Sequence, residues 1–332
     1  MEQKIPGSCD EIKISSKPKT APYVSVVIPL YCSEKTIGFV VNEVRQELER
    51  LNIADYEIIL VNDCSPDNVL AVAGELALQD KNVKVVSLAR NSGQTAAMMV
   101  GYRYASGKFI INMDDDGQHP GNEIGKLLET LEREDLDVVF ARYGTKKQSG
   151  FRIFGSFINQ KMAEIMVGKP KGIRTNSFFV MRKFVRDEII RYTNNYPYIF
   201  GIIFAVTGKV GNTDVIHRPR LEGKSNYNLR KLFALWFNGF LNFSAKPLRI
   251  STVLGFVIAA VAVGAGVWTL ISRILNPDAP LGWASTMIVI LFFAGVQLAS
   301  IGLLGEYLGR LYISSSKLPT AVVRETINLD DL

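Results

Sequence analysis

The sequence predicts an α/β fold: a mostly parallel sheet with flanking helices, followed by interfacial helices and a two-helix transmembrane hairpin. Two observations support this prediction. Between residues 23 and 142, short β-branched runs alternate with helical patterns, and a βαβα series of this kind forms a parallel sheet with right-handed crossovers. Nearer the carboxyl end, the runs 250–272 and 279–305 contain no Asp, Glu, Lys or Arg.

Five apolar runs are the predicted strands. They lack a strict alternation of apolar and polar residues, as is typical of strands covered on both faces. The runs comprise residues 23–31, 56–63, 83–90, 108–116 and 137–142. After the first run, apolar residues at the period of an α-helix predict a helix from Ile37 to Leu51.

Polar side chains stand at the end of every predicted strand. The carboxyl ends of parallel strands meet at one edge of a sheet, and open α/β sheets bind their ligands at that edge. The sequence therefore predicts a binding crevice there. Its residues are Pro29, Tyr31 and Glu34 from the first strand, Asp63 from the second, Arg90 from the third, Asp114, Asp115 and Asp116 from the fourth, and Arg142 from the fifth.

The turn after the first strand excludes two common kinds of nucleotide site. A dinucleotide-binding fold needs a glycine-rich turn there, whereas the first glycine, Gly38, already lies within the predicted helix. The sequence also contains no Walker A loop. The ligand must therefore be held in another way.

The adjacent carboxylates of Asp114, Asp115 and Asp116 suggest a metal site. Like charges repel one another, and the repulsion grows in a cleft of low dielectric constant. A divalent cation, Mg²⁺ or Mn²⁺, removes that repulsion by binding one or two carboxylates, with water and substrate phosphates completing its shell. The alternative is a solvated acidic turn. The polar residues at the other strand ends favour a metal–diphosphate site.

Charge and cysteine content limit the partners and the compartment. The chain has 332 residues, with 38 Lys and Arg against 32 Asp and Glu, and a net charge of +6 is too small to indicate a nucleic-acid partner. Cys9, Cys32 and Cys64 are scattered, without zinc-site spacing. An odd number of cysteines forms no disulfide framework, so we expect a reducing compartment.

Both charge-free runs exceed the roughly 20 residues that a membrane-spanning helix needs. The alternative is a pair of buried core helices. Residues 1–22 are polar, and we expect no secretory signal there. The positive-inside rule places both termini and residues 1–249 in the cytoplasm. The bases that support this orientation are Arg230, Lys231, Lys246 and Arg249 before the first run and Arg310, Lys317 and Arg324 after the second.

Four motifs, in order along the chain, resemble those of family-2 glycosyltransferases with the GT-A fold. They are SVVIPLYCSE, VNDCSPD, ARNSGQTAAMMVGY and MDDDGQHP. The hairpin, the segment RLEGKSNY and the tail LLGEYLGRLY narrow the resemblance to polyprenyl-phosphate glycosyltransferases. That group includes dolichyl-phosphate mannose synthase-like enzymes and bacterial undecaprenyl-phosphate sugar transferases. The resemblance covers roughly residues 23–318 and implies a bacterial inner-membrane enzyme.

The resemblance also implies roles for individual residues. Asp63 matches the carboxylate that reads the nucleotide base, and Asp114 and Asp116 match a DxD pair that holds the metal. The implied catalytic residues are Asp114, Asp116, Gln118 and Arg142. The resemblance, the strand ends and the basic loop 218–224 together give the predicted donor-binding residues, which are Pro29, Tyr31, Glu34, Asp63, Arg90, Asp114, Asp115, Arg220, Lys224 and Ser225.

This chain departs from the family pattern at several site positions. Cys32 stands where Asn is usual, and Cys64 stands where Gly is usual. His119 and Gly121 replace the usual Asp and Pro after the DxD pair. Ser177 and Phe179 fall where many members have Asp and Arg. The change at Ser177 weakens the assignment of a catalytic base there.

A lipid phosphate acceptor fits this departure, because a phosphate is already ionised near neutral pH and can attack without a strong base. The resemblance implies a single displacement with inversion, from a nucleotide-sugar with uridine favoured. The candidate acceptor-binding residues are Arg218, Arg230, Lys231, Lys246 and Arg249. The alternative for these bases is a role as ordinary positive-inside anchors.

The predicted division of the chain is a flexible segment 1–22, a GT-A domain 23–226, an amphipathic juxtamembrane segment 227–249, two membrane helices 250–305 and a cytoplasmic tail 306–332. We expect a homo-oligomer, in which residues 320–328 of the tail could pair with a neighbouring chain. Two other functions are alternatives. A processive polysaccharide synthase would need more spans and a QxxRW-type motif, and a non-catalytic membrane scaffold or transport component would not need an intact DxD pair.

Overall fold

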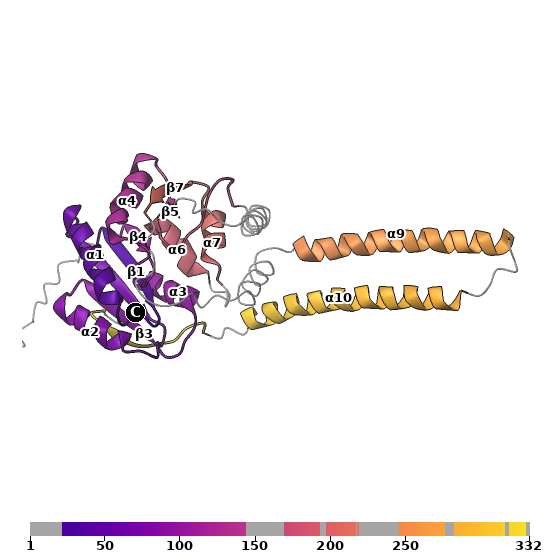
Figure 1. Cartoon of the computed structure of the whole chain (residues 1–332), viewed down its shortest axis with the longest axis horizontal. Helices are drawn as coiled ribbons and strands as arrows, with labels where there is room; N and C mark the ends of the chain where they lie inside the picture. The colour runs from indigo at the N-terminus through magenta and orange to yellow at the C-terminus, as the bar shows by residue number, and fades with distance from the viewer. Residues whose placement is uncertain are drawn as a thin grey trace, which may run out of the picture.

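A computed structural model describes residues 22–143, 169–192, 197–216, 218, 246–275, 282–315 and 319–329. The globular part is a sheet covered by helices, and two long antiparallel helices, α9 (Lys246–Leu275) and α10 (Trp283–Ser315), run side by side away from it (Figure 1).

The sheet has eight strands in the order β7-β5-β6-β4-β1-β2-β3-β8. Six of them are parallel to one another, and β6 and β8 run antiparallel, so the prediction of a mostly parallel sheet is confirmed. The strands are β1 (Val24–Leu30), β2 (Tyr56–Asn62), β3 (Val83–Leu88), β4 (Phe109–Asn112), β5 (Val138–Tyr143), β6 (Phe179–Arg182), β7 (Val210–Val215) and β8 (Val323–Ile327).

Helices cover both faces of this sheet. One face packs against α1 (Ile37–Arg50), α2 (Val69–Gln79) and α4 (Ile124–Arg133), which follows the short 3₁₀ helix η1 (Gly121–Glu123). The other face packs against α3 (Gln94–Tyr104), α6 (Lys183–Arg191) and α7 (Ile199–Val206).

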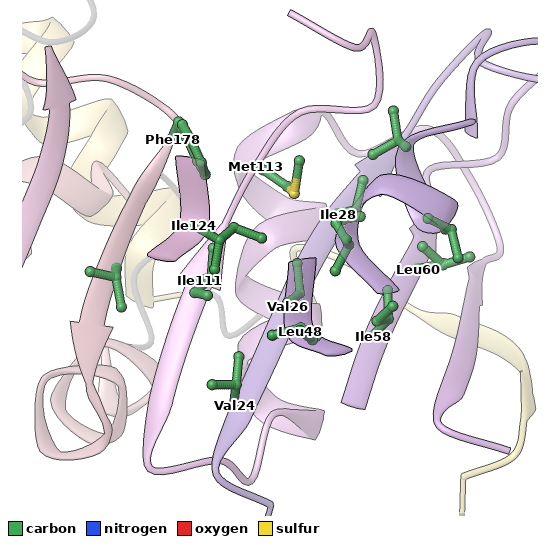
Figure 2. Close-up of a cluster of buried hydrophobic side chains, with 14 of the residues drawn as sticks. Val24, Val26, Ile28, Leu48, Ile58, Leu60, Ile111, Met113, Ile124 and Phe178 are labelled. Atoms are coloured by element: carbon green, nitrogen blue, oxygen red, sulfur yellow. The ribbon is translucent and has the colours of Figure 1, made fainter. Parts of the chain in front are cut away.

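Strand β1 shows why the apolar runs lack alternation. All seven of its residues are buried, because odd and even positions reach different cores. Val24, Val26 and Ile28 point to the first core, shown in Figure 2, and Val27 points to the second. Helix α3 approaches this second face closely: a Cβ on Gly101 would lie 2.4 Å from Cγ1 of Val27.

The structure differs from the sequence prediction in the strands that follow β5. The sequence pattern predicts neither β6, which lies between β4 and β5, nor β7 at the far edge. The strand character of residues 320–328 is confirmed, but their strand β8 pairs with β3 of the same chain, whereas the sequence suggested a pairing with a neighbouring chain. This pairing covers main-chain groups that an edge strand would otherwise expose.

Helices α9 and α10 contain two stretches long and apolar enough to cross a membrane, Ser251–Trp268 and Phe292–Ile313. Core helices pass the same test, but no residue of either stretch is buried within the described part of the chain, which argues against that alternative. The second stretch extends beyond the predicted run 279–305 toward the carboxyl end. A hydrogen bond of 3.0 Å between the hydroxyls of Ser251 and Ser300 joins the two helices.

Candidate active site

The topology brings the predicted polar residues to one edge of the sheet. Strands β1 to β5 all end at that edge, because β4 and β5 both run antiparallel to β6. For the same reason the two antiparallel strands, β6 and β8, begin there. Residues that precede an antiparallel strand can therefore join the site as well.

Asp63 is buried at the end of β2, where main-chain amides hold its carboxylate. One oxygen accepts a hydrogen bond from the amide of Ser92 at 2.7 Å, and the other accepts one from Gly93 at 2.8 Å. Burial raises the pKa of Asp63, and these two hydrogen bonds act against the increase. Gly93 has φ 89° and ψ 153°, a conformation essentially restricted to glycine.

Hydrogen bonds also tie the loops after β1 and β2 together. The amide of Cys32 donates to Oγ of Ser65 at 2.8 Å, and the amide of Glu34 donates to Oδ2 of Asp67 at 2.9 Å. In return, Glu34 accepts from the amide of Asn68 at 3.1 Å. Ser65 and Asp67 are not among the residues predicted for the site, although a cluster of Asp, Ser and Pro is a turn signal.

The backbone of these loops shows the conformational cost of two departures from the expected family pattern. Cys32 has φ 56° and Cys64 has φ 49°, in the left-handed region. Asn and Gly are the residues that adopt this conformation most readily, and they are the usual residues at the two positions. Both cysteines therefore carry backbone strain.

Asp114 follows β4, and side chains hold its carboxylate. Oδ1 accepts a hydrogen bond from Nε2 of Gln94 at 2.8 Å, and Oδ2 accepts one from the hydroxyl of Ser177 at 2.6 Å. The Asp114 amide donates to Nδ1 of His119 at 2.9 Å. Ser177 thus contacts Asp114, the first residue of the predicted DxD pair. The sequence showed only that Ser177 stands where Asp is expected, and it did not predict this contact. Gln94 was missed, although it lies in a quoted motif.

Asp115 links the acidic segment to the loop after β1. Its Oδ2 accepts a hydrogen bond from the amide of Tyr31 at 2.9 Å, and its carbonyl oxygen accepts one from the hydroxyl of Thr36 at 2.7 Å. Burial, assisted by the charge of Asp114, raises the pKa of Asp115 to about 6, although the hydrogen bond from the Tyr31 amide lowers it.

Asp116 and Gln118 form the end of this acidic segment. Oδ1 of Asp116 accepts a hydrogen bond from the amide of Gln118 at 3.0 Å. The ring of His119 is buried and stacks on Phe178, with centroids 5.1 Å apart.

Within the described ranges, no group of three His, Cys, Asp or Glu side chains is placed to hold a metal without help. Mg²⁺ typically needs only one or two carboxylates beside substrate phosphates, so the residues present fit such an ion.

The described arginines predicted for the site all have protein partners. Arg142 forms a bidentate pair with Asp214 of β7, at 2.6 and 2.8 Å. Nη1 of Arg218 contacts Glu43 of α1 at 2.5 Å. Arg90 reaches the carbonyl of Pro319 at 3.5 Å. An incoming anion would have to share or displace these partners.

Several predicted residues cannot be placed in the site. Arg220, Lys224, Ser225, Arg230 and Lys231 lie outside the described residues. Lys246 and Arg249 belong to the first turn of α9, where only the backbone is described. Pro29 lies in β1, opposite Val61 of β2, and the side chain of Tyr31 is exposed at the edge.

Two family models match separate parts of the chain. The model described as glycosyl transferase family 2 matches residues 25–190, and the model described as the GtrB C-terminal hairpin matches residues 246–311. Together they cover the acidic segment, α9 and most of α10.

Two curated relatives match nearly the whole chain. A prophage bactoprenol glucosyl transferase homolog of Escherichia coli is 30% identical over 311 residues, which covers 91% of this chain and 98% of the relative. An undecaprenyl-phosphate 4-deoxy-4-formamido-L-arabinose transferase of Proteus mirabilis is 31% identical over 316 residues, which covers 92% and 94%.

Solved structures share the fold of the globular part. Glucosyl-3-phosphoglycerate synthase from Mycobacterium tuberculosis, in complex with Mn²⁺, uridine diphosphate and phosphoglyceric acid, superposes with a TM-score of 0.50 at 17% identity. The match covers 65% of this chain and 75% of the synthase.

Proposed function

This chain belongs to glycosyl transferase family 2, and from that premise we propose that it transfers a sugar from a nucleotide-sugar to a membrane polyprenyl phosphate. The observation that carries the proposal is the extent of the resemblance. The bactoprenol and undecaprenyl-phosphate sugar transferases match both the domain with the acidic segment and the apolar hairpin. The lipid-linked sugar would then serve a cell-envelope glycan or lipid modification.

The donor we propose is a uridine diphosphate sugar, bound along the carboxyl edge of the sheet. Asp63, in the loop after β2, suits recognition of the base, because each of its oxygens keeps a second lone pair. Asp116, with help from Asp114, would hold Mg²⁺ or Mn²⁺ beside the diphosphate. A bound divalent cation would neutralise the charge that develops on the leaving diphosphate.

Ser177 supports an acceptor that needs no general base. Its hydroxyl is engaged with Asp114, and it stands where many family members have Asp. A phosphate monoester is ionised near neutral pH, so its oxygen can attack the sugar carbon directly. We therefore propose a single displacement with inversion, in which Asp114 and Ser177 orient the donor.

The short link after α10 supports an acceptor that stays in the membrane. Ser315 ends α10, and Pro319 contacts Arg90 at the donor edge. Four residues of chain span at most about 14 Å. The end of the hairpin and the donor edge must therefore lie close together, which suits a lipid whose phosphate sits at the membrane surface.

The sheet also supports a topology with both flanks of the hairpin on one side. Strand β7 precedes the hairpin and β8 follows it, yet both belong to the same sheet. A hairpin between them would cross the membrane twice and return to the same side. We propose that this side is the cytoplasm of a bacterium, as the basic flanks predict. The homo-oligomer remains a prediction.

The basic residues near the hairpin remain candidates for the acceptor site. Lys246 and Arg249 lie in the first turn of α9, directly before the first candidate span, which begins at Ser251. Arg218 is described with Glu43 as its partner, so its part in acceptor binding would require that pair to open.

One experiment separates this function from a non-catalytic scaffold. The purified full-length protein is incubated with undecaprenyl phosphate, MnCl₂ and a panel of radiolabelled nucleotide-sugars, and lipid-extractable label is measured. We expect one nucleotide-sugar to yield a lipid-linked sugar. Absence of product with every donor, from protein that inserts normally into membranes, would support the scaffold. A polymer, in place of a single-sugar lipid, would support a processive synthase.

A further inference from the structure

Strand β8 extends the sheet beside β3, although the hairpin separates the two in sequence. Val85 pairs with Ile327 and Ser87 pairs with Glu325 in antiparallel register, with an irregularity between Ser87 and Leu88. In Figure 1 the yellow carboxyl-terminal segment runs back along this edge of the globular part. The domain that binds the donor thus includes a strand from beyond the hairpin.

Contacts on both faces show that β8 is a built part of the domain. Ile327 packs against the core on the α2 side, and Val323 and Leu329 pack against the core on the α3 side. The Asn328 side chain donates to the carbonyl of Ala77 at 2.7 Å and to that of Val83 at 2.9 Å. These contacts fix the far end of the strand.

The other end of β8 reaches the segment that holds Asp63. The amide of Ala89 donates to the carbonyl of Val322 at 2.8 Å, and Arg90 contacts the carbonyl of Pro319. Three residues further on, the amides of Ser92 and Gly93 hold the Asp63 carboxylate. Strand β8 therefore holds this segment at the point where it leaves the sheet, and α3 holds its other end.

We propose that β8 is a positioning element of the donor site: it fixes residues 89–93, and through them the carboxylate of Asp63. The inference rests on the proposed function, because it assigns Asp63 to donor binding. It predicts that loosening β8 weakens nucleotide binding in protein that is still folded, whereas a strand that only covers the sheet edge would affect stability alone.

The register identifies a residue that tests the main chain of β8. Main-chain groups of a strand alternate between its two neighbours. Since Ala89 turns toward β8, Ser87 does so too, and the amide of Glu325 opposite Ser87 faces β3. The Glu325 side chain is exposed, so replacing it leaves the packing of both cores intact.

The test compares Glu325→Pro, which removes this amide, with Glu325→Ala, which keeps it. Full-length protein is titrated with UDP in the presence of MnCl₂ by calorimetry, and exchange of the Ser92 and Gly93 amides is followed by hydrogen–deuterium exchange. We expect Glu325→Pro to raise the Kd for UDP at least about fivefold, as when a hydrogen bond to a charged group weakens, and to speed exchange. Glu325→Ala should change neither.

A second pair of variants decides the matter if Glu325→Pro does not fold. Asn328→Gly removes the two hydrogen bonds of the Asn328 side chain, and glycine readily keeps the local φ of 59°. Asn52→Gly is the control, because it replaces an asparagine of similar φ, 55°, in the turn after α1, away from β8. We expect a weaker affinity for UDP only in Asn328→Gly. Unchanged Kd and exchange in folded β8 variants would overturn this inference alone. If wild-type protein binds no nucleoside diphosphate, both the proposed function and this inference fail.

Discussion

Asp63 and Asp114 stand at the same edge of one sheet, yet different kinds of group hold their carboxylates. Asp63 is buried and accepts hydrogen bonds from the main-chain amides of Ser92 and Gly93. Asp114 is partly exposed and accepts hydrogen bonds from the side chains of Gln94 and Ser177. The Asp63 end of the site is thus built by the backbone, and the Asp114 end is built by side chains.

This difference indicates where the site can vary. A main-chain amide is present whatever side chain a residue carries, so the Asp63 end depends on backbone conformation. At the Asp114 end, each substitution adds or removes a hydrogen-bonding group. Departures from the expected family pattern at Ser177 and His119 change such groups at this second end, beside the proposed metal and sugar. The departure at Cys64, next to Asp63, instead affects backbone conformation at the first end. Four predictions test the comparison, from the largest expected effect to the smallest.

The largest effect should come from Asp116→Asn, at the side-chain end. The amide keeps the shape of the carboxylate but loses its charge, and a metal contributes several kcal/mol to stabilising a leaving diphosphate. We expect transfer to fall at least about a thousandfold, with much weaker UDP binding in MnCl₂. The assay measures lipid-linked sugar formation. Full activity of EDTA-treated wild-type protein would contradict this prediction.

Gly93→Ala should have the next largest effect, at the backbone end. Open space surrounds the new methyl group, so the cost is conformational: φ 89° with ψ 153° is strained by about 1–3 kcal/mol for alanine. We expect the KM for the donor to rise by roughly 5- to 150-fold. Ser92→Ala is the matched control, because it keeps the main-chain amide that donates a hydrogen bond to Asp63. Equal effects of the two substitutions would show that the backbone does not set this end.

Ser177→Ala tests the side-chain end more finely. It removes the hydroxyl that donates to Oδ2 of Asp114, and a hydrogen bond to a charged group contributes about 1.5–3 kcal/mol. We expect kcat/KM to fall by about tenfold or more. Ser177→Thr retains a hydroxyl and should restore most of the activity. Wild-type kinetics for Ser177→Ala would mean that the other contacts of Asp114 suffice to hold it.

The smallest effect concerns backbone strain at Cys64. Glycine removes about 1–2 kcal/mol of left-handed strain but adds about 0.5–1 kcal/mol of unfolded-state entropy. We expect Cys64→Gly to raise Tm by about 2 °C. Cys64→Ser keeps the strain and should leave Tm unchanged. A lower Tm for Cys64→Gly than for Cys64→Ser would show that the thiol contributes packing that outweighs the strain.

The position of the site could be predicted from the sequence because the evidence is local. Buried parallel strands require continuous β-branched runs, and the residues after each run fall at one edge whatever the exact strand order. Asp63 and the segment from Asp114 to Asp116 were placed in this way. The hairpin could be predicted for the same reason, since a span needs about 20 consecutive apolar residues.

The hydrogen-bond partners within the site could not be predicted in this way. Asp114 meets Ser177, Arg142 meets Asp214, and β3 meets β8, each across a long stretch of chain. No periodicity within a segment specifies such a pair. The antiparallel strands β6 and β8 bring the residues that precede them to the edge of the sheet. Strands of only four and five residues give little signal of their own.

The sequence by itself determined the α/β class, the acidic edge and the apolar hairpin, because each depends on the composition or spacing of neighbouring residues. Only the tertiary structure decided that backbone amides hold Asp63, that side chains hold Asp114, and that the segment after the hairpin completes the sheet. Those arrangements depend on which distant segments pack together. Packing is decided by the whole set of buried contacts and satisfied hydrogen bonds, and no single stretch of residues contains that information.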